Sequence, residues 1–484
     1  MNPRLVLRVA AVLLLIIAGF MLIPMGIAMV SDSSREAVAF AIPIVTMIVL
    51  AALLLLIVRK TRNPVLSTRD GYILVSLSWI LASLFGCLPF FLSGAIPGFT
   101  DSFFETISGF TTTGASILTE IQSLPRSILF WRSLTHWLGG MGIVVLTVAV
   151  LPLLGIGGLQ LIQAEAPGPT VDRLTPRITE TAKYLWFIYV GFTVAETILL
   201  MAGGMNLFDA LTHTFGTLAT GGFSPMNASV GHYNSIYING VVTVFMIMAG
   251  INFSLHFKVV TGRFSSVWKD SELRAYLIIF LVASGVIIFD LNANAIYGTF
   301  REAVSHGTFQ AASILTTTGY ATTDFERWPF LSQTILLTLM FVGGCSGSTG
   351  GGIKVIRILT LLKQGLTEMK YLVHPRAFFT LKISGQTVKN PVVHAISGFF
   401  FLYVFLILLV TLTVSVAEHD VLTSLTTALA TVGNIGPGLG NIGPAENYAF
   451  YPPWIKWVLS FAMLVGRLEL YTVLVLLTPS FWRR

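Results

Sequence analysis

Long apolar runs separated by short polar stretches dominate the chain. Ten of these runs approach the roughly 20 residues that a helix needs to cross a bilayer. The first is too long for a cleaved signal peptide, and no small-residue cleavage site ends it. Shorter, semi-polar segments precede runs four, six, eight and ten. The pattern predicts membrane-spanning helices at about 4–30, 36–58, 69–93, 127–155, 180–203, 233–258, 272–291, 330–362, 392–417 and 453–482.

Composition supports this interpretation. Of the 484 residues, 54% are hydrophobic and only 11% are charged, whereas a soluble domain has about 25% charged residues. These values exclude a soluble globule, a disordered chain and a coiled coil. Cys87 and Cys345 both lie in apolar stretches and are interpreted as small space-filling residues rather than a disulfide.

The distribution of basic residues predicts the orientation. If both termini are cytoplasmic, 22 of the 29 Lys and Arg residues fall in inside segments, a strong positive-inside bias. The net charge of +7 therefore needs no nucleic-acid partner to explain it. No inside segment is long enough for a nucleotide-binding domain, so nucleotide control would have to come from another chain. The predicted inside segments are 1–8, 59–70, 156–183, 258–274, 354–389 and the C-terminal arginines.

Four short segments share a Thr-Gly pattern, and each lies between two predicted spans. Small residues used for helix packing are the alternative explanation, but four copies at Gly-to-Gly spacings of 108, 97 and 114 favour an internal repeat. The segments are Thr112-Thr113-Gly114, Thr220-Gly221-Gly222, Thr317-Thr318-Gly319 and Thr431-Val432-Gly433.

The repeat predicts an all-α membrane protein. Its ten transmembrane helices form four pseudo-symmetric units of helix, pore helix, filter loop and helix around one pore, plus two extra N-terminal helices. The predicted boundaries are 1–66 for the extra helices and 67–160, 176–262, 270–366 and 390–484 for the four pore repeats.

Such a unit suits cation conduction. Backbone carbonyls can replace the water around an ion if they face a common axis, and glycine accepts the positive φ that this arrangement requires. The C-terminal end of each short helix, which carries partial negative charge, favours a cation nearby. Because the segments hold no ring of carboxylates, a monovalent ion is favoured over a divalent one.

These motifs resemble the Trk/Ktr/HKT superfamily of potassium transporters, and the two extra N-terminal spans resemble its bacterial TrkH/TrkG branch. The resemblance implies K⁺ uptake across the bacterial inner membrane through a gated, Rb⁺-permeable pore with weaker Na⁺ passage. It also implies a homodimer and a cytosolic, TrkA-like nucleotide-binding partner, without a covalently bound cofactor or an enzymatic activity. Only one filter glycine is shared by all four repeats, so we expect a short filter; Gly114, where some Na⁺-transporting relatives have Ser, favours K⁺.

A glycine-rich break interrupts the eighth predicted span at 343–352. Six glycines in ten residues disfavour a regular helix, and Ile353 stands where a Walker A loop requires Lys. A tight packing turn and a loop lining the pore below the filter remain as alternatives. The resemblance favours the second and predicts a gate formed by Gly347, Ser348, Thr349, Gly350 and Gly351 together with Arg467.

Arg467 is a charge inside the tenth span, and such residues are functional candidates by default. The alternative is a structural pair with Glu469. Gly140, Gly250, Gly344 and Gly466 follow their filter glycines at 26, 28, 25 and 33 residues, which would place Arg467 level with the glycine-rich break.

Other polar residues receive simpler interpretations. Asp101, Asp209 and Asp420 lie near the starts of short helices, where they would act as caps or attract cations. The basic segment 354–389 either anchors the topology or binds a cytosolic partner through Lys363, Lys370 and Arg376. We find no nucleophile–base pair for an intramembrane enzyme. A K⁺/H⁺ or K⁺/Na⁺ symporter remains the alternative to a channel-like conductor.

Overall fold

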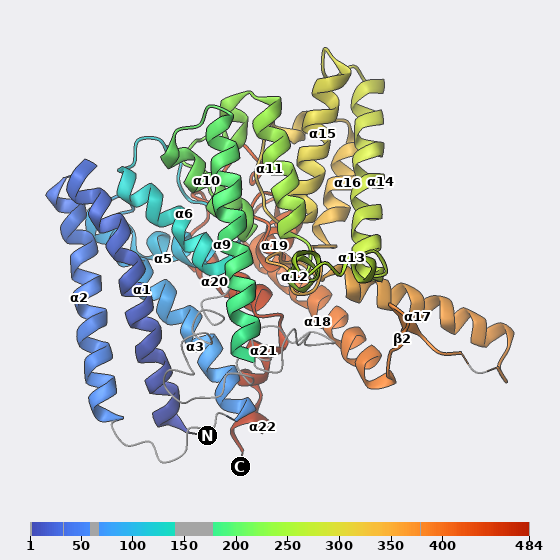
Figure 1. Ribbon diagram of the computed structural model, residues 1–484, viewed down its shortest axis with the longest axis horizontal. Helices are drawn as coiled ribbons and strands as arrows, with labels where there is room; N and C mark the ends of the chain where they lie inside the picture. Colours follow the sequence, from blue (N-terminus) through green and yellow to red (C-terminus); the bar gives the residue numbers. More distant parts are fainter. Residues whose placement is uncertain (1, 32, 59–66, 141–177, 378, 484) are drawn as a thin grey trace.

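The computed structural model describes residues 2–31, 33–58, 67–140, 178–377 and 379–483, and this part of the chain is almost entirely helical (Figure 1). Six of its helices are long and apolar enough to cross a membrane, or eight if two sharply bent pairs each count as one span. Two predicted spans correspond to shorter helices. Helix α6 (Arg126–Gly140) stops where the described residues stop, so 141–155 of the fourth predicted span lie outside them, and α16 (Phe330–Met340) ends before the glycine-rich break.

Helices α1 (Pro3–Ser31) and α2 (Ser34–Ile57) lie side by side at one edge of the molecule (Figure 1). Ser33 and Glu36 form a capping box that starts α2. Pro24 and Pro43 lie inside these two helices, where neighbouring helices and local adjustments can satisfy the freed backbone groups. Helix α1 also packs against α3 and α6, which attaches the pair to the rest of the molecule.

Four groups of helices follow. They are α3 (Thr68–Gly86), α4 (Leu88–Ser93), α5 (Phe99–Phe110) and α6; α9 (Ile178–Ala202), α10 (Leu207–Ala219), α11 (Ile236–Ala249) and α12 (Phe253–Val260); α14 (Ser271–Ala293), α15 (Phe300–Leu315) and α16; and α18 (Asn390–Ser415), α19 (Val421–Val432), α20 (Pro453–Arg467) and α21 (Tyr471–Leu474). The second main helix of each group, α5, α10, α15 or α19, has 12 to 16 residues and is called its short helix. The connections include α13 (Phe264–Trp268), η2 (Ser229–Tyr233), η3 (Phe325–Arg327), η4 (Val475–Leu477) and α22 (Pro479–Trp482).

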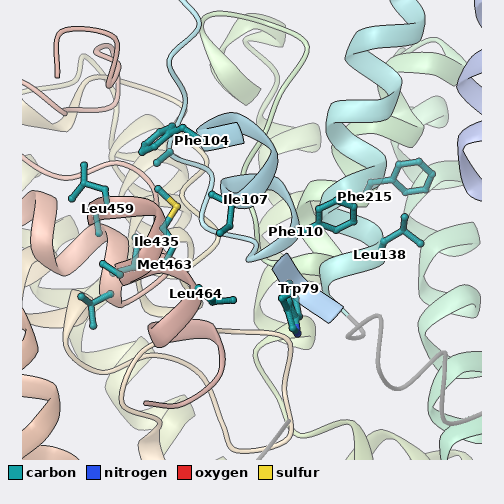
Figure 2. Close-up of a cluster of buried hydrophobic side chains, with 14 of the residues drawn as sticks. Trp79, Phe104, Ile107, Phe110, Leu138, Phe215, Ile435, Leu459, Met463 and Leu464 are labelled. Atoms are coloured by element: carbon teal, nitrogen blue, oxygen red, sulfur yellow. The ribbon is translucent and has the colours of Figure 1, made fainter. Parts of the chain in front are cut away.

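The helix that follows the short helix in each group packs against the short helix of the next group. Thus α6 packs on α10, α11 on α15 and α16 on α19, and α20 returns to pack on α5, the short helix of the first group. Buried side chains of α3, α5 and α20 meet in the same region of the core (Figure 2). The packing order therefore closes on itself, as expected for units arranged around one axis.

Glycines allow the short helices to approach their neighbours closely. A side chain at Gly139 would collide with the carbonyl oxygen of Phe110, at the end of α5, and one at Gly466 would collide with that of Val432, at the end of α19. Gly140 lies against Ala219 in the same way at the end of α10. Small residues at such positions are typical of helix contacts in membrane proteins, and here they bring the C-terminal ends of the short helices into the core.

The two ends of the chain lie at the same end of the molecule (Figure 1). The Asn2 N–H donates to Asp70 Oδ1 at 2.9 Å, and Arg69 Nη1 donates to the Arg483 carbonyl at 3.0 Å, so both ends contact the start of α3. Helix α17 (Val355–Val373) projects from the body on this side of the bundle (Figure 1) and is followed by a hairpin of β1 (Lys382–Ile383) and β2 (Gln386–Thr387). The cytoplasmic assignment of the two ends stays a prediction.

Candidate functional site

Each of the four short helices leads into a segment with the same unusual backbone. Two residues with positive φ, separated by one residue, follow the helix end, and the second of them is always glycine. A Thr in this region is a conformational outlier, and such strain is typical of functional sites. The pairs are Thr112 and Gly114 (53° and 80°), Thr220 and Gly222 (54° and 79°), Thr317 and Gly319 (61° and 79°), and Asn434 and Gly436 (54° and 93°).

The fourth segment is therefore not the one that the sequence pattern predicts. Thr431 and Val432 lie in the last turn of α19, and Gly433 caps it with a φ of −79°. The corresponding turn lies three residues later, at Asn434-Ile435-Gly436. Asn tolerates the left-handed conformation better than Thr, so the Thr-x-Gly pattern used to align the repeats is absent there. With Gly436 as reference, Gly466 follows at 30 residues instead of 33, closer to the other three spacings.

The backbone of each segment is tied to its own short helix. The N–H of the residue before the glycine donates to a carbonyl five residues back: Thr113 to Ser108 at 2.9 Å, Gly221 to Gly216 at 2.8 Å, Thr318 to Ser313 at 2.8 Å and Ile435 to Ala430 at 2.8 Å. These bonds occupy the N–H groups of the segments but not their carbonyl oxygens. Within the described part of the chain, no backbone N–H donates to the carbonyl oxygens of Thr112, Thr113, Thr220, Gly221, Thr317, Thr318, Asn434 and Ile435, although the His136 ring lies against the Gly221 backbone.

The four segments also contact one another in a closed sequence. A side chain at Gly114 would collide with the carbonyl of Gly221, one at Gly222 with that of Thr318, and one at Gly319 with that of Ile435. A side chain at Gly436 would lie 2.6 Å from the carbonyl oxygen of Thr113, which returns to the first segment. Carbonyls of four segments thus surround a common centre, and glycine is required at each contact.

Together the four segments form what we call the carbonyl ring. A cavity of about 140 Å³ lies on the side of this ring where the four positive-φ glycines are found. All four positive-φ glycines line it, together with the residues that follow them. Its wall includes Arg132, a buried side chain of α6, and the segment from Ile442 to Tyr448. The cavity gives the ring an open face from which an ion can enter.

The glycine-rich break lies against the helix side of the ring. The Gly351 N–H donates to the Thr317 hydroxyl at 2.6 Å, and the Gly352 N–H donates to the Gly433 carbonyl at 3.0 Å. On its other side, the loop hydrogen-bonds to the bend between α11 and α12, where Cys345 N–H donates to the Gly250 carbonyl at 2.8 Å. Residues 343–354 are not helical, in agreement with the sequence prediction of a break.

Arg467 binds this loop. Its Nη1 donates to the Thr349 carbonyl at 2.7 Å, and its Nη2 donates to the carbonyls of Gly139 at 2.7 Å and Gly140 at 3.1 Å. Glu469, which the sequence offered as an alternative partner, instead forms an ion pair with Arg357 of α17. The structure therefore brings Arg467 and the predicted gate residues together, through backbone carbonyls rather than through a carboxylate.

A set of polar residues behind the ring escaped the sequence analysis. Each lies on a short helix nine residues before its positive-φ glycine. Glu105 accepts a hydrogen bond from Ser116 Oγ at 2.9 Å, and His213 Nε2 lies 3.0 Å from Ser224 Oγ. The other two members of the set are Gln310 and Thr427. The equal spacing is visible in the sequence, but only after the fourth segment has been aligned on Gly436.

The predicted caps have different roles. Asp420 caps α19 and accepts a hydrogen bond from the Thr423 N–H at 3.1 Å. Asp209 lies in the first turn of α10, whose cap is Asn206, and Asp101 forms an ion pair with Lys456 at 2.5 Å. Among the described residues, no group of three or more His, Cys, Asp or Glu side chains is arranged to hold a metal ion. An ion bound at the ring would therefore rely on backbone and hydroxyl oxygens.

Comparisons with known proteins show the family to which the chain belongs. The family model described as TrkH, cation transport protein, matches residues 36–484. The chain is 40% identical to the Trk system potassium uptake protein TrkH of Escherichia coli K12 and 43% identical to that of Halomonas elongata, in each case over 100% of both chains. It superimposes on the crystal structure of the potassium transporter TrkH from Vibrio parahaemolyticus with a TM-score of 0.88, at 40% identity and with full coverage of both chains.

Proposed function

Since this chain belongs to the TrkH family of cation transport proteins, we propose that it carries K⁺ into the cell through a pore at the centre of the carbonyl ring. The four groups of helices would act as pseudo-symmetric repeats with the boundaries predicted from the sequence, within a fold of ten transmembrane helices. The relatives named above are potassium uptake proteins and transporters, and none is named as an enzyme.

One observation carries the proposal. The carbonyls of residues 112–113, 220–221, 317–318 and 434–435, which accept no backbone hydrogen bond in the described part of the chain, lie next to one another in a closed ring. An unpaired buried carbonyl is costly, and a dehydrated cation is the ligand that such oxygens bind in a selectivity filter. The ring has fewer carbonyl layers than a long filter, so we expect it to pass Rb⁺ and, more weakly, Na⁺.

Uptake through such a pore needs no pump. A membrane potential of about 100 mV, negative inside, is worth about 2.3 kcal/mol per elementary charge. At about 1.4 kcal/mol per tenfold, this potential sustains roughly a 40-fold K⁺ gradient. A channel-like conductor is therefore sufficient for accumulation of this size.

Flux measurements on the purified protein test the proposal. In liposomes with an imposed potential, K⁺ and Rb⁺ should enter faster than Na⁺ and Li⁺. Empty liposomes and liposomes that contain the heat-denatured protein serve as controls. Equal rates for all four ions, or no flux above the controls, would contradict K⁺-selective conduction.

We further propose that the glycine-rich loop and Arg467 form a gate on the helix side of the ring. The contacts of Arg467 with Thr349 and of Gly351 with Thr317 support this role, because they connect the loop both to a fixed charge and to a filter segment. A cytosolic nucleotide-binding partner would move the loop through α17, which begins directly after it. A homodimer is part of the same proposal.

Binding measurements test the partner hypothesis. Lys363, Lys370 and Arg376 lie on α17 and just after it, on the projecting part of the molecule. Neutralising the three should weaken the binding of a cytosolic regulatory subunit. Unchanged binding by a correctly inserted triple variant would leave these residues with a topological role only.

One residue favours coupled transport as the second candidate function. Glu196 lies inside α9 and is fully buried, and its carboxylate lies beside the Thr217 side chain without an ion-pair partner in the described part of the chain. Ionisable groups inside a membrane often mark proton pathways. A K⁺/H⁺ symporter would shift its reversal potential when a proton gradient is imposed, and the Glu196→Gln variant would abolish that shift. A reversal potential that follows K⁺ alone would exclude this candidate.

A further inference from the structure

A buried ion pair lies directly behind the first two filter segments. Arg132 of α6 and Glu105 of α5 are joined by a bond of 2.7 Å between Nε and Oε1. Their side chains are 2% and 0% exposed. Breaking such a pair on one side leaves an uncompensated charge in the protein interior, so both residues are tightly constrained.

Glu105 holds the first segment. Ser116 Oγ and the Ile117 N–H both donate to its carboxylate at 2.9 Å. Ser116 lies two residues after Gly114, in the stretch that leads from the ring to the outer cavity. The carboxylate therefore fixes the chain immediately beyond the first filter glycine.

Arg132 holds the second segment. Its Nη1 donates to the Ser224 carbonyl at 2.9 Å, and its guanidinium lies over the Phe223 ring at 3.6 Å from the centroid. Phe223 directly follows Gly222, and its other contacts include the His136 ring at 4.1 Å. Arg132 and His136 are four residues apart, so one face of α6 holds the residue beyond the second filter glycine.

The pair has no charged counterpart in the other repeats. The residues that correspond to Glu105 are His213, Gln310 and Thr427, none of which is acidic. Thr427 contacts the Tyr451 hydroxyl at 2.7 Å, a neutral contact that does not reach a neighbouring filter segment. A buried ion pair therefore joins the first and second segments, whereas the stretch beyond the fourth segment is held by the Thr427 hydroxyl and by the half-buried Glu326 carboxylate, which accepts the Gly440 N–H.

We propose that Glu105 and Arg132 are positioning residues that determine ion selectivity by fixing the spacing between the first and second filter segments. The inference rests on the proposed function, because it concerns the ions that pass the ring. The arrangement and number of the filter carbonyls determine which ion they favour, and the pair holds two of the four segments in that arrangement. Loss of the Glu105–Arg132 pair therefore lets more kinds of ion pass, although every filter oxygen is still present.

Permeability ratios measured in liposomes test this role. We expect Glu105→Gln and Arg132→Gln to raise the Na⁺/K⁺ permeability ratio by about threefold to tenfold, the range that corresponds to one net hydrogen bond. Arg132→Lys keeps the charge but loses the planar contact with Phe223, so it should give a smaller rise. Ser116→Ala, which removes one bond between Glu105 and the filter and leaves the ion pair intact, should also give a smaller rise.

The double variant separates positioning from charge balance. Glu105→Gln combined with Arg132→Gln restores neutrality, so it should recover thermal stability relative to the singles but keep the raised Na⁺/K⁺ ratio. Lys456→Gln is the matched control, because Lys456 pairs with Asp101 on the same helix α5 but does not contact a filter segment. It should change stability without changing the ratio.

The outcomes are distinguishable. If the wild-type protein conducts no K⁺, the proposed function fails. If it conducts K⁺ and the folded variants keep the wild-type ratio, or if the double variant restores it, the Glu105–Arg132 pair has no role in selectivity. Should the single Gln variants not fold, Ser116→Ala and Arg132→Lys decide, and an unchanged ratio in both overturns the proposal.

Discussion

The ring and the glycine-rich loop beside it are both irregular, glycine-based backbone inside a helical protein, but different interactions hold them. Each ring segment is tied to its own short helix by a backbone hydrogen bond and contacts the next segment through a glycine. The loop depends on side chains from distant helices. Arg467 of α20 binds the Thr349 carbonyl, and Glu272 of α14 accepts hydrogen bonds from the N–H groups of Ser346 and Ile356 at 2.6 and 3.1 Å.

This difference suggests that the ring is held rigidly, whereas the position of the loop can be controlled from other helices. Local backbone bonds fix each ring segment on its own short helix, and the buried Glu105–Arg132 pair beside the first two segments adds to this local support. Because charged side chains on other helices hold the loop, a movement of those helices changes its position. We therefore expect substitutions in the ring to change which ions pass and substitutions around the loop to change how many pass.

The largest effect is expected at the ring glycines. A Ser at Gly114 or Gly319 would be strained by a φ near +80° and would collide with the Gly221 or Ile435 carbonyl. Left-handed backbone costs an ordinary residue about 1–2 kcal/mol, so the K⁺/Na⁺ flux ratio should fall by about tenfold. Gly204→Ser is the control, because Gly204 has a φ of +100° but nothing within 4 Å. A wild-type ratio in the ring variants would refute the filter assignment.

The second prediction concerns the corrected fourth segment. Gly436→Ser should reduce K⁺ preference nearly as much as Gly114→Ser, because Gly436 lies next to the Thr113 carbonyl at a φ of +93°. Gly433→Ala should change selectivity less, since Gly433 has an ordinary φ of −79° and a Cβ there would meet the Leu429 carbonyl of α19 rather than a neighbouring ring segment. Comparing the two flux ratios decides between the alignments. A larger loss of selectivity at Gly433 would restore the original prediction from the sequence.

The position of the fourth segment shows which parts of the fold and of the site could be predicted from the sequence. Long apolar runs predicted membrane-spanning helices, six of which, or eight with the bent pairs, are present in the described part of the chain, and the repeated Thr-Gly pattern coincides with three of the four positive-φ turns. The fourth failed because Asn434 replaces Thr in the left-handed position, and a second Thr-x-Gly triplet three residues earlier attracted the alignment. Both Thr and Asn adopt the left-handed conformation at this position of the turns, so a pattern that requires Thr misses the turn that begins with Asn434.

Contacts between residues far apart in the sequence were harder to predict. Arg467 was identified as a functional candidate because a charge in a membrane span is unusual, but its partners are the backbone carbonyls of Thr349, Gly139 and Gly140. Carbonyls are present at every position, so no sequence pattern marks them. The Glu105–Arg132 pair was missed for a related reason: its members are 27 residues apart and lie on two helices whose packing only the fold defines.

A smaller effect is expected when the loop is released. Arg467→Ala removes three hydrogen bonds to backbone carbonyls and a positive charge that repels cations where screening is weak. Basal K⁺ flux should rise several-fold, in line with the loss of one to two net hydrogen bonds, while the K⁺/Na⁺ ratio stays unchanged. Deleting part of Gly347–Gly351 should have a similar effect.

Combining Arg467→Ala with the loop deletion tests whether the two act at the same constriction. If Arg467 and the loop act at one constriction, the double variant should raise flux by less than the product of the single effects. A multiplicative increase would indicate two separate barriers. An Arg467→Ala protein with normal flux and reduced thermal stability would show that the contact is structural and that the gate lies elsewhere.

The smallest effect is expected at the outer end of α19, which supports the fourth ring segment from outside. Asp420 accepts the Thr423 N–H, and its hydrogen bonding with Thr423 lowers the pKa of the carboxyl below the ordinary value of 3.8. Because the folded pKa lies below the unfolded one, this stabilisation is present above about pH 4 and is lost as the pH falls through the folded pKa. Asp420→Ala should therefore destabilise the protein by about 0.5–1 kcal/mol at pH 7, with a difference in melting temperature from wild type that narrows on acidification. The K⁺/Na⁺ ratio should not change, because the bond between Ile435 N–H and the Ala430 carbonyl holds the ring segment independently of the cap; a change in the ratio would show that the ring is not locally fixed.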